Sequence, residues 1–98
     1  MRVPRRTIDR IRESIRLREY DFTAHAMEEM AEDNLDILDV EHAILTGQIA
    51  RIERNDPRGI RYFVQGMARG TETLVGVVGR FATARRYLVI TVYAIDEE

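Results

Sequence analysis

The spacing of apolar residues changes at Gly47, and this change constrains the fold more than any other feature of the chain. Before Gly47, apolar residues recur every three or four positions, as on one face of a helix. After it, they alternate with polar residues or form short β-branched runs between turn sequences. Helices followed by a run of strands are the α+β pattern of packed layers. We therefore predict an α+β fold with about three N-terminal helices, followed by a four-stranded antiparallel sheet covered on one side.

Three amphipathic segments precede Gly47. The expected helices are residues 7–18, 24–32 and 36–46. Thr23 is a good N-cap for the second helix, because its hydroxyl can accept a hydrogen bond from the first turn. Gly47 is suited to end the third.

Four segments after Gly47 have strand composition, and turn sequences separate them. The expected strands are residues 48–54, 60–67, 73–82 and 87–93. The predicted core consists of Ile37, Val40, Ile44, Val75, Val77, Leu88, Ile90 and Val92. Alternation places Leu88, Ile90 and Val92 on one face of the last strand. With that register, replacing Ile90 by Ala would cost about 2–5 kcal/mol.

Length and composition limit the class of protein. Ninety-eight residues suffice for one core, so we expect a single domain over residues 1–98. The chain has no cysteine, which excludes disulfides, thiolate catalysis and cysteine-ligated metals. No apolar stretch approaches the about 18 residues that cross a membrane. The basic start lacks the apolar run of a secretory signal, so we expect a cytoplasmic location.

The charges are unevenly distributed. All 15 basic residues are arginine, and seven of them lie in residues 1–18 beside only two acids. Residues 19–46 contain nine acids and no arginine. A pI near 5.7 argues against indiscriminate coating of nucleic acid. A local arginine site is still compatible with this pI, because the planar guanidinium matches phosphate geometry.

His25 is the stronger candidate for chemistry of the two histidines. With Thr23 as N-cap, His25 falls in the first helical turn, where the positive end of the helix dipole disfavours imidazolium. Glu28 and Glu29 act in the opposite sense and can orient the ring. Such a histidine can exchange protons near neutral pH, or it can simply bond to backbone at the helix end. His42 is expected to be a surface residue.

The remaining residues permit one kind of catalysis. The sequence contains no nucleophile elbow, no glycine-rich phosphate loop and no metal-ligand spacing, so no cofactor or metal is expected. Metal-free RNA cleavage needs an acid, a base and cations around the phosphate. Candidate cations are Arg61, Arg80, Arg85 and Arg86, and candidate tyrosines are Tyr62, Tyr87 and Tyr93. For each tyrosine, packing within the sheet is the alternative.

Several short blocks follow one another over about residues 20–95. They are Tyr20-x-x-Thr23-x-His25-Ala26-x-x-x-Met30, Leu35, Asp39-Val40-Glu41-x-Ala43-Ile44-x-x-Gly47, Asp56-Pro57, Arg61-Tyr62 and Ile90-Thr91-Val92-Tyr93. In this order they resemble a family of small bacterial proteins catalogued as a domain of unknown function and often compared with toxins of toxin–antitoxin pairs. The resemblance implies a fold like that of the RelE, MqsR and BrnT toxins. It also implies endoribonuclease activity and a cognate antitoxin, often one with a small zinc finger.

The resemblance assigns family positions to four residues. The signature histidine is His25, the strand arginine is Arg61, and the closing pair is Thr91 and Tyr93.

Two positions depart from the family. Members commonly have arginine just before the methionine and again three residues after it, where this chain has Glu29 and Asp33. Either RNA binding has moved to the arginine-rich first helix and the sheet, or this member no longer cleaves RNA.

Two functions are therefore open. The first is a toxin that cleaves mRNA without a metal through a 2′,3′-cyclic phosphate, with His25 as acid or base, Arg61 as a phosphate clamp and Tyr93 as a positioning group. Its substrate-binding residues would be Arg80, Tyr62, Thr91 and Arg85. The second is a non-catalytic interaction module that binds a partner through the acidic helices. A basic groove on the sheet beside His25 favours the first, and a flat, apolar or acidic face favours the second.

Overall fold

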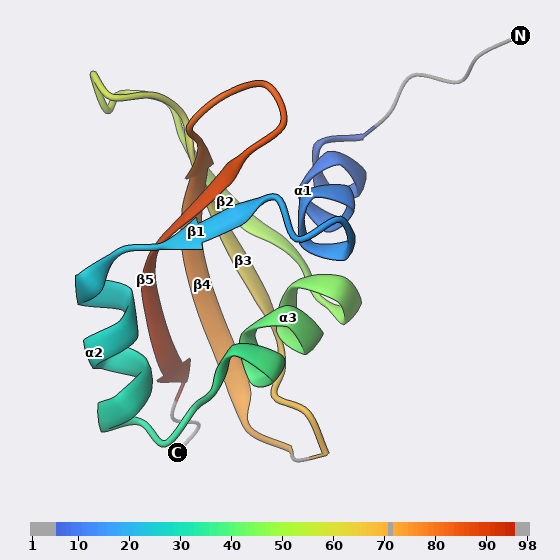
Figure 1. The fold of residues 1–98 in the computed structure, drawn as a ribbon, viewed down its shortest axis with the longest axis vertical. Helices are drawn as coiled ribbons and strands as arrows, with labels where there is room; N and C mark the ends of the chain where they lie inside the picture. Colours follow the sequence, from blue (N-terminus) through green and yellow to red (C-terminus); the bar gives the residue numbers. More distant parts are fainter. Residues whose placement is uncertain (1–5, 71, 96–98) are drawn as a thin grey trace, which may run out of the picture.

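The computed structural model describes residues 6–70 and 72–95, which contain three helices and five strands (Figure 1). In chain order these are α1 Thr7–Arg16, β1 Tyr20–Phe22, α2 Ala24–Glu32, α3 Ile37–Thr46, β2 Gln48–Glu53, β3 Arg61–Met67, β4 Leu74–Phe81 and β5 Tyr87–Ile95. The predicted α+β class is confirmed. The boundaries of all seven predicted elements lie within two residues of those observed.

The sheet has the strand order β1-β5-β4-β3-β2, and its four longer strands are antiparallel as predicted. The prediction of only four strands is wrong, because β1 pairs in parallel with β5, placing Tyr20 opposite Tyr87. The Glu19 carbonyl accepts a hydrogen bond from Tyr87 N–H, and Thr23 N–H donates to the Val89 carbonyl. The sheet is therefore mixed. A strand of three residues is too short for alternation to reveal it.

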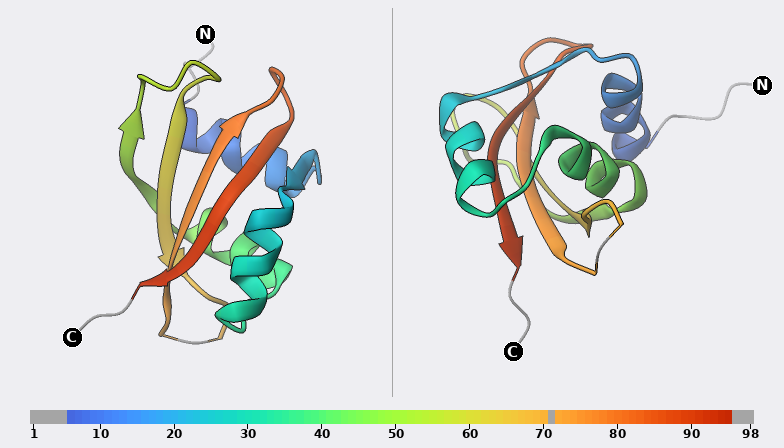
Figure 2. Two further views of the ribbon diagram at one scale, coloured as in Figure 1. Left: turned by 90° about the vertical axis from the view of Figure 1, so that its left-hand side faces the viewer. Right: turned by 60° about the horizontal axis from the view of Figure 1, so that its bottom comes forward.

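The helices lie on one side of the sheet, while the opposite side of β2–β5 carries no helix among the described residues (Figure 2). The buried residues of α1 include Ile11 and Ile15, and α2 contributes Ala26 and Met30. α2 runs beside β5, at the sheet edge where β1 pairs (Figure 2). Within the described ranges, no helix is long and apolar enough to cross a membrane.

Most of the predicted core is buried, and Ile37 is an exception. Ile37 is the first residue of α3 and is 41% exposed, because it lines a hollow beside α2 instead of packing on the sheet. The predicted core residues that are buried are Val40, Ile44, Val75, Val77 and Val92.

The predicted register of β5 is wrong for Leu88 and Ile90, which are only partly buried. Val89 is fully buried in their place. The cause is a β-bulge: the pairing of β4 with β5 shifts between Val78 and Gly79, so that Ile90 is an extra residue on β5. The inward-facing positions of β5 therefore change parity at the bulge. Alternation within one strand cannot predict this shift, since it depends on the partner strand.

Replacing Val89 with Ala is expected to destabilise the protein by roughly 2 kcal/mol, and by more than replacing Ile90 with Ala. Val89 loses contacts within a closed core, whereas Ile90 is only partly buried at the bulge. Urea unfolding of the two variants beside the wild type measures both losses. A larger loss of unfolding free energy for Ile90→Ala would indicate that Ile90 faces the core and would contradict the bulge.

Candidate functional site

The side of the sheet without helices, here called the open face, presents three rows of side chains. Strand register places Glu53, Arg61, Arg80 and Leu88 in the first row, Arg51, Phe63, Val78 and Thr91 in the second, and Gln48, Gln65, Gly76 and Tyr93 in the third. The Arg51 guanidinium lies 4.0 Å from the centre of the Phe63 ring. The open face thus combines arginines and aromatic rings with apolar side chains.

His25 lies in the first turn of α2, beside the edge of β5. The Thr23 hydroxyl fixes this position, because it accepts a hydrogen bond from Ala26 N–H at 3.0 Å and donates to the Ile90 carbonyl at 2.9 Å. The His25 Nε2 atom lies 3.3 Å from Glu29 Oε1. The His25 side chain is 65% exposed, so a substrate can reach its ring.

Glu29 has a second partner that sequence reasoning missed. Its Oε1 atom accepts a hydrogen bond from Val92 N–H at 3.1 Å. One helical turn later, Asp33 Oδ2 accepts one from Ala94 N–H at 2.9 Å. Both N–H groups belong to the part of β5 that lies beyond the short pairing with β1. The carboxylates of Glu29 and Asp33, one helical turn apart, thus accept hydrogen bonds from two backbone N–H groups on the edge of β5 that β1 does not cover.

This capping gives a physical reason for the two departures from the family pattern. An arginine at position 29 or 33 could not accept these hydrogen bonds, because a guanidinium has no acceptor. The bond to Val92 also holds the Glu29 carboxylate in place beside the histidine. His25 therefore has an orienting partner that is itself fixed to the sheet.

Thr91 and Tyr93 lie on the open face on either side of Val92, the residue that Glu29 binds. The Tyr93 ring lies across Gly76 of β4, where a Cβ atom would come within 2.3 Å of the ring. Glycine at this position is therefore what allows the ring to lie against the sheet. The two closing residues of the family pattern thus lie beside the strand segment to which the His25–Glu29 pair is attached.

The two arginines of the first row differ in availability. Arg61 is paired with Glu53, and its Nε lies 3.6 Å from Asp56 Oδ2. Hydrogen bonds from Arg58 lower the pKa of Asp56, so this carboxyl is ionised at neutral pH. The Arg80 guanidinium makes no hydrogen bond or ion pair with any residue in the described ranges. A phosphate would therefore meet a free cation at Arg80, whereas Arg61 would first have to leave its carboxylates.

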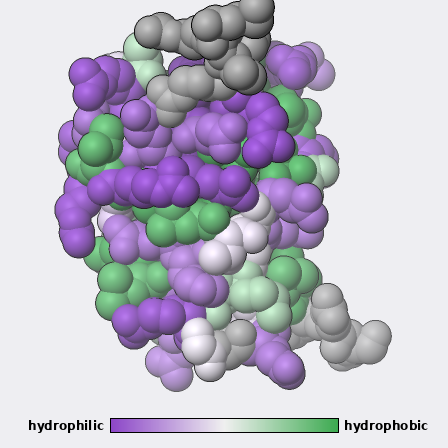
Figure 3. All heavy atoms as spheres, turned by 90° about the vertical axis from the view of Figure 1, so that its right-hand side faces the viewer, coloured by the Kyte–Doolittle hydropathy of each residue, from purple (hydrophilic) through white to green (hydrophobic). Residues whose placement is uncertain are grey.

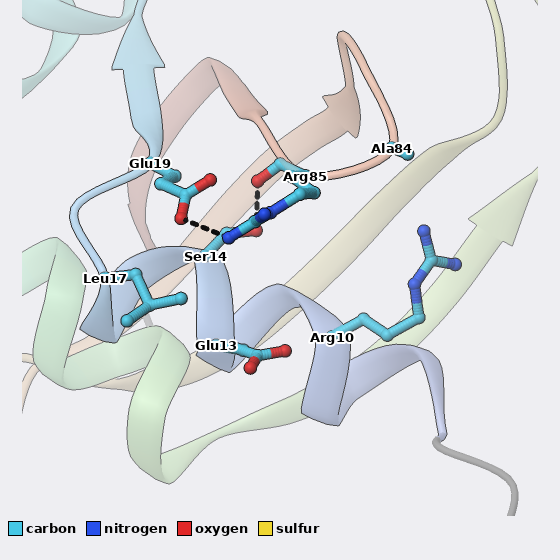
Figure 4. Close-up of a pocket in the computed structure, with 7 residues that line it drawn as sticks. All are labelled: Arg10, Glu13, Ser14, Leu17, Glu19, Ala84 and Arg85. Atoms are coloured by element: carbon cyan, nitrogen blue, oxygen red, sulfur yellow. Dashed lines mark hydrogen bonds and ion pairs between the residues drawn. The ribbon is translucent and has the colours of Figure 1, made fainter.

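Two predicted substrate-binding residues do not belong to the open face. Tyr62 is buried on the helix side, with its ring edge-on to Phe81 at a centroid distance of 6.1 Å. Arg85 lies between β4 and β5, where its guanidinium bonds to Glu19 at 3.1 Å and its carbonyl accepts from the Ser14 hydroxyl at 3.0 Å (Figure 4). Tyr62 is a core residue, and Arg85 lines a separate hollow beside α1.

Two further candidates are also engaged elsewhere. Arg86 pairs with Asp21 at 2.6 Å, and Tyr87 is fully buried with its ring across Gly79.

Two arginines of α1, Arg10 and Arg12, contact other elements of the fold. Arg12 donates to the carbonyls of Ile44 and Gly47 at the end of α3. The Arg10 guanidinium lies 4.4 Å from the centre of the Phe81 ring. The surface seen from the α1 side is mostly hydrophilic, with apolar patches between the polar side chains (Figure 3).

Within residues 6–70 and 72–95, no group of three or more His, Asp or Glu side chains could hold a metal ion. What the arrangement offers is an exposed imidazole beside a carboxylate at the edge of β5, and a free guanidinium at Arg80 on the open face. A carboxylate-oriented imidazole is suited to proton transfer.

The fold and the site define a small α+β protein with a histidine–carboxylate pair at the edge of an arginine-bearing sheet face. Residues 22–94 match the domain of unknown function DUF4258, and the chain belongs to this family. No curated protein and no solved structure matches the chain. The likeness to RelE, MqsR and BrnT toxins therefore has no matching structure to support it and stays a proposal.

Proposed function

We propose that this chain is a metal-independent endoribonuclease of the toxin type, with His25 as its acid–base residue. The observation that carries the proposal is the chain of contacts from His25 to Glu29 and from Glu29 to Val92 N–H. These contacts hold an exposed imidazole beside the edge of β5, the strand that carries Thr91 and Tyr93. A toxin of this kind would be paired with a cognate antitoxin protein.

In the proposed reaction, the imidazole of His25 takes the proton of an RNA 2′-hydroxyl. The 2′-oxygen attacks the adjacent phosphorus, and the bond from phosphorus to the 5′-oxygen breaks. The leaving 5′-oxygen takes up the proton from the imidazolium, leaving a 2′,3′-cyclic phosphate. In this proposal Arg80 stabilises the added charge on the phosphate, and Tyr93 positions the nucleotide.

Replacing Glu29 with Gln tests this proposal, and Asp33→Asn is its matched control. Both amides can still accept the hydrogen bond from β5, so the sheet edge stays capped. Only Glu29 contacts the histidine. We expect Glu29→Gln to lower the rate of cleavage of end-labelled single-stranded RNA in EDTA about tenfold or more. Asp33→Asn should leave the rate unchanged, and equal losses in the two variants would contradict an orienting role for Glu29.

Replacing Arg80 with Ala should lower kcat/KM for RNA by about 10- to 100-fold. A hydrogen bond to a charged group is worth about 1.5–3 kcal/mol, and each 1.4 kcal/mol corresponds to a factor of ten. Arg85→Ala is the matched control, because Arg85 is paired with Glu19 in a hollow beside α1. Steady-state cleavage of a short fluorescent RNA measures both. A loss for Arg85→Ala as large as that for Arg80→Ala would move the phosphate site away from the open face.

The second candidate function is a non-catalytic interaction module. One observation favours it specifically: an apolar hollow lies between the acidic helices α2 and α3. If the folded wild-type protein cleaves no RNA at high enzyme concentration, this second function takes the place of the first.

A further inference from the structure

An apolar groove lies between α2 and the start of α3. Its volume is about 420 Å³. Three of its side chains, Met27, Ile37 and Leu38, are 45%, 41% and 44% exposed. The groove is lined by Met27, Met30, Ala31, Leu35, Asp36, Ile37 and Leu38. A cluster of exposed apolar side chains with polar surroundings is typical of an interaction surface.

The helix α2, which forms one wall of the groove, carries negative charges that nothing in the described part of the chain neutralises. The carboxylates of Glu28 and Glu32 make no ion pair or hydrogen bond with described residues. The last turn of α2 contains no basic residue. Carboxylates there are unfavourable, because the carboxyl end of a helix carries partial negative charge. Asp33 is compensated by its bond to Ala94, but Glu28 and Glu32 have no such partner.

We propose that this groove binds a basic amphipathic helix of a partner protein. The apolar side of that helix would cover Met27, Ile37 and Leu38, and its arginines or lysines would lie against Glu28 and Glu32. The groove is complementary to such a segment in both respects, since its lining is mostly apolar and the helix that forms one wall is acidic. This mode of recognition places an amphipathic helix in an apolar groove.

Three other occupants fit the groove less well. A small molecule would stay largely in water, because three of the lining side chains, Met27, Ile37 and Leu38, are themselves more than 40% exposed, whereas small-molecule pockets bury about 70–90% of a ligand. An added β-strand would need a free edge, and Glu29 and Asp33 already cap β5 beside α2. A second copy of this chain that used the same groove would bring its own acidic α2 to the interface, so like charges would face each other there.

Binding of a helix in this groove does not depend on RNA cleavage. His25 and Met27 are two positions apart in α2 and therefore lie on different sides of the helix. His25→Ala should bind the partner helix as the wild type does, so failure of one proposal leaves the other standing.

The test uses a fluorescein-labelled 18-residue helix of leucine and lysine, with leucines along one face, and follows its anisotropy on titration with the protein. We expect saturable binding that weakens with added salt. Leu38→Ala should weaken it about tenfold, as expected for an anchor in an apolar groove. Leu17→Ala is the matched control, because Leu17 is 54% exposed but lies at the end of α1. Replacing Glu28 and Glu32 together with Gln should weaken binding and reduce its salt dependence.

Several results would overturn the proposal. One is the absence of saturable binding by the wild type. Another is equal weakening by Leu17→Ala and Leu38→Ala, which would indicate non-specific adhesion. A third is equal binding of a control peptide with glutamate in place of every lysine. A dimer in analytical ultracentrifugation that Leu38→Ala dissociates would assign the groove to a second copy of the chain instead.

Discussion

The His25→Ala variant is expected to lose RNA cleavage by about 10²–10⁴-fold while staying folded. This is the range that a positioned acid–base group contributes. The ring is 65% exposed and its only described contact is with Glu29, so its removal leaves the core unchanged. In cells, expression of the wild type without an antitoxin should arrest growth, and His25→Ala should relieve the arrest. Cleavage of end-labelled RNA in EDTA measures the loss, and circular dichroism confirms the fold.

His42→Ala is the matched control for this variant. His42 Nδ1 lies 2.8 Å from the Met67 carbonyl, on the side of α3 that meets the end of β3. Its loss should leave the cleavage rate within a factor of two or so of wild type, because it removes no group from the proposed site. Equal cleavage by wild type and His25→Ala, or a loss confined to His42→Ala, would contradict the assignment of His25.

The Gly66→Ala variant is expected to destabilise the protein by about 3 kcal/mol or more. A Cβ atom at Gly66 would lie 2.0 Å from the Ala43 carbonyl oxygen and 2.7 Å from its carbon. Both are backbone atoms of α3, so the clash can be relieved only by moving the helix away from the sheet. Overpacking costs of 1–3 kcal/mol are usual where side chains can adjust, and here they cannot. Chemical unfolding measures the loss.

Gly70→Ala is the control for Gly66→Ala. Nothing lies within 4 Å of a Cβ at Gly70, although its φ of 68° makes alanine unfavourable by itself. Gly70→Ala should therefore cost about 1–2 kcal/mol, clearly less than Gly66→Ala. Equal losses would show that α3 does not lie as close to β3 as described.

The elements that could be predicted from sequence are those that carry their own repeating pattern. The helices and the four longer strands each span enough residues for a period of 3.6 or 2 to be visible. β1 has three residues, and its position depends on the partner that it finds on β5. The bulge at Ile90 is likewise a property of two strands, so a single strand's alternation assigned Ile90 to the core in place of Val89.

The candidate site was partly predictable for a similar reason. His25 and its glutamates are close in sequence, and helical spacing alone indicates that Glu29 can reach the ring. The bond from Glu29 to Val92 joins residues 63 positions apart, so no local pattern predicts it. The pairing of Arg61 with Glu53 and Asp56 is also tertiary, and it makes Arg80 the freer cation.

The acidic character of α2 now has two separate explanations. Glu29 and Asp33 stabilise the sheet, because their carboxylates accept hydrogen bonds from backbone N–H groups at the edge of β5. The carboxylates of Glu28 and Glu32 make no ion pair or hydrogen bond with a described residue, and the helix that carries them forms one wall of the apolar groove. The two acids that stand where family members commonly have arginine thus hold α2 to the edge of β5.

The most direct test of the central claim is the chemistry of the RNA ends. A short RNA that the protein cleaves is prepared with a single 2′-deoxynucleotide on the 5′ side of the cut, and the products are mapped by mass spectrometry. Cleavage initiated by proton removal from the 2′-hydroxyl predicts a 2′,3′-cyclic phosphate and a 5′-hydroxyl, and it predicts no cut at the deoxy position. Products with a 3′-hydroxyl and a 5′-phosphate, or undiminished cutting at the deoxy position, would contradict the proposed role of His25.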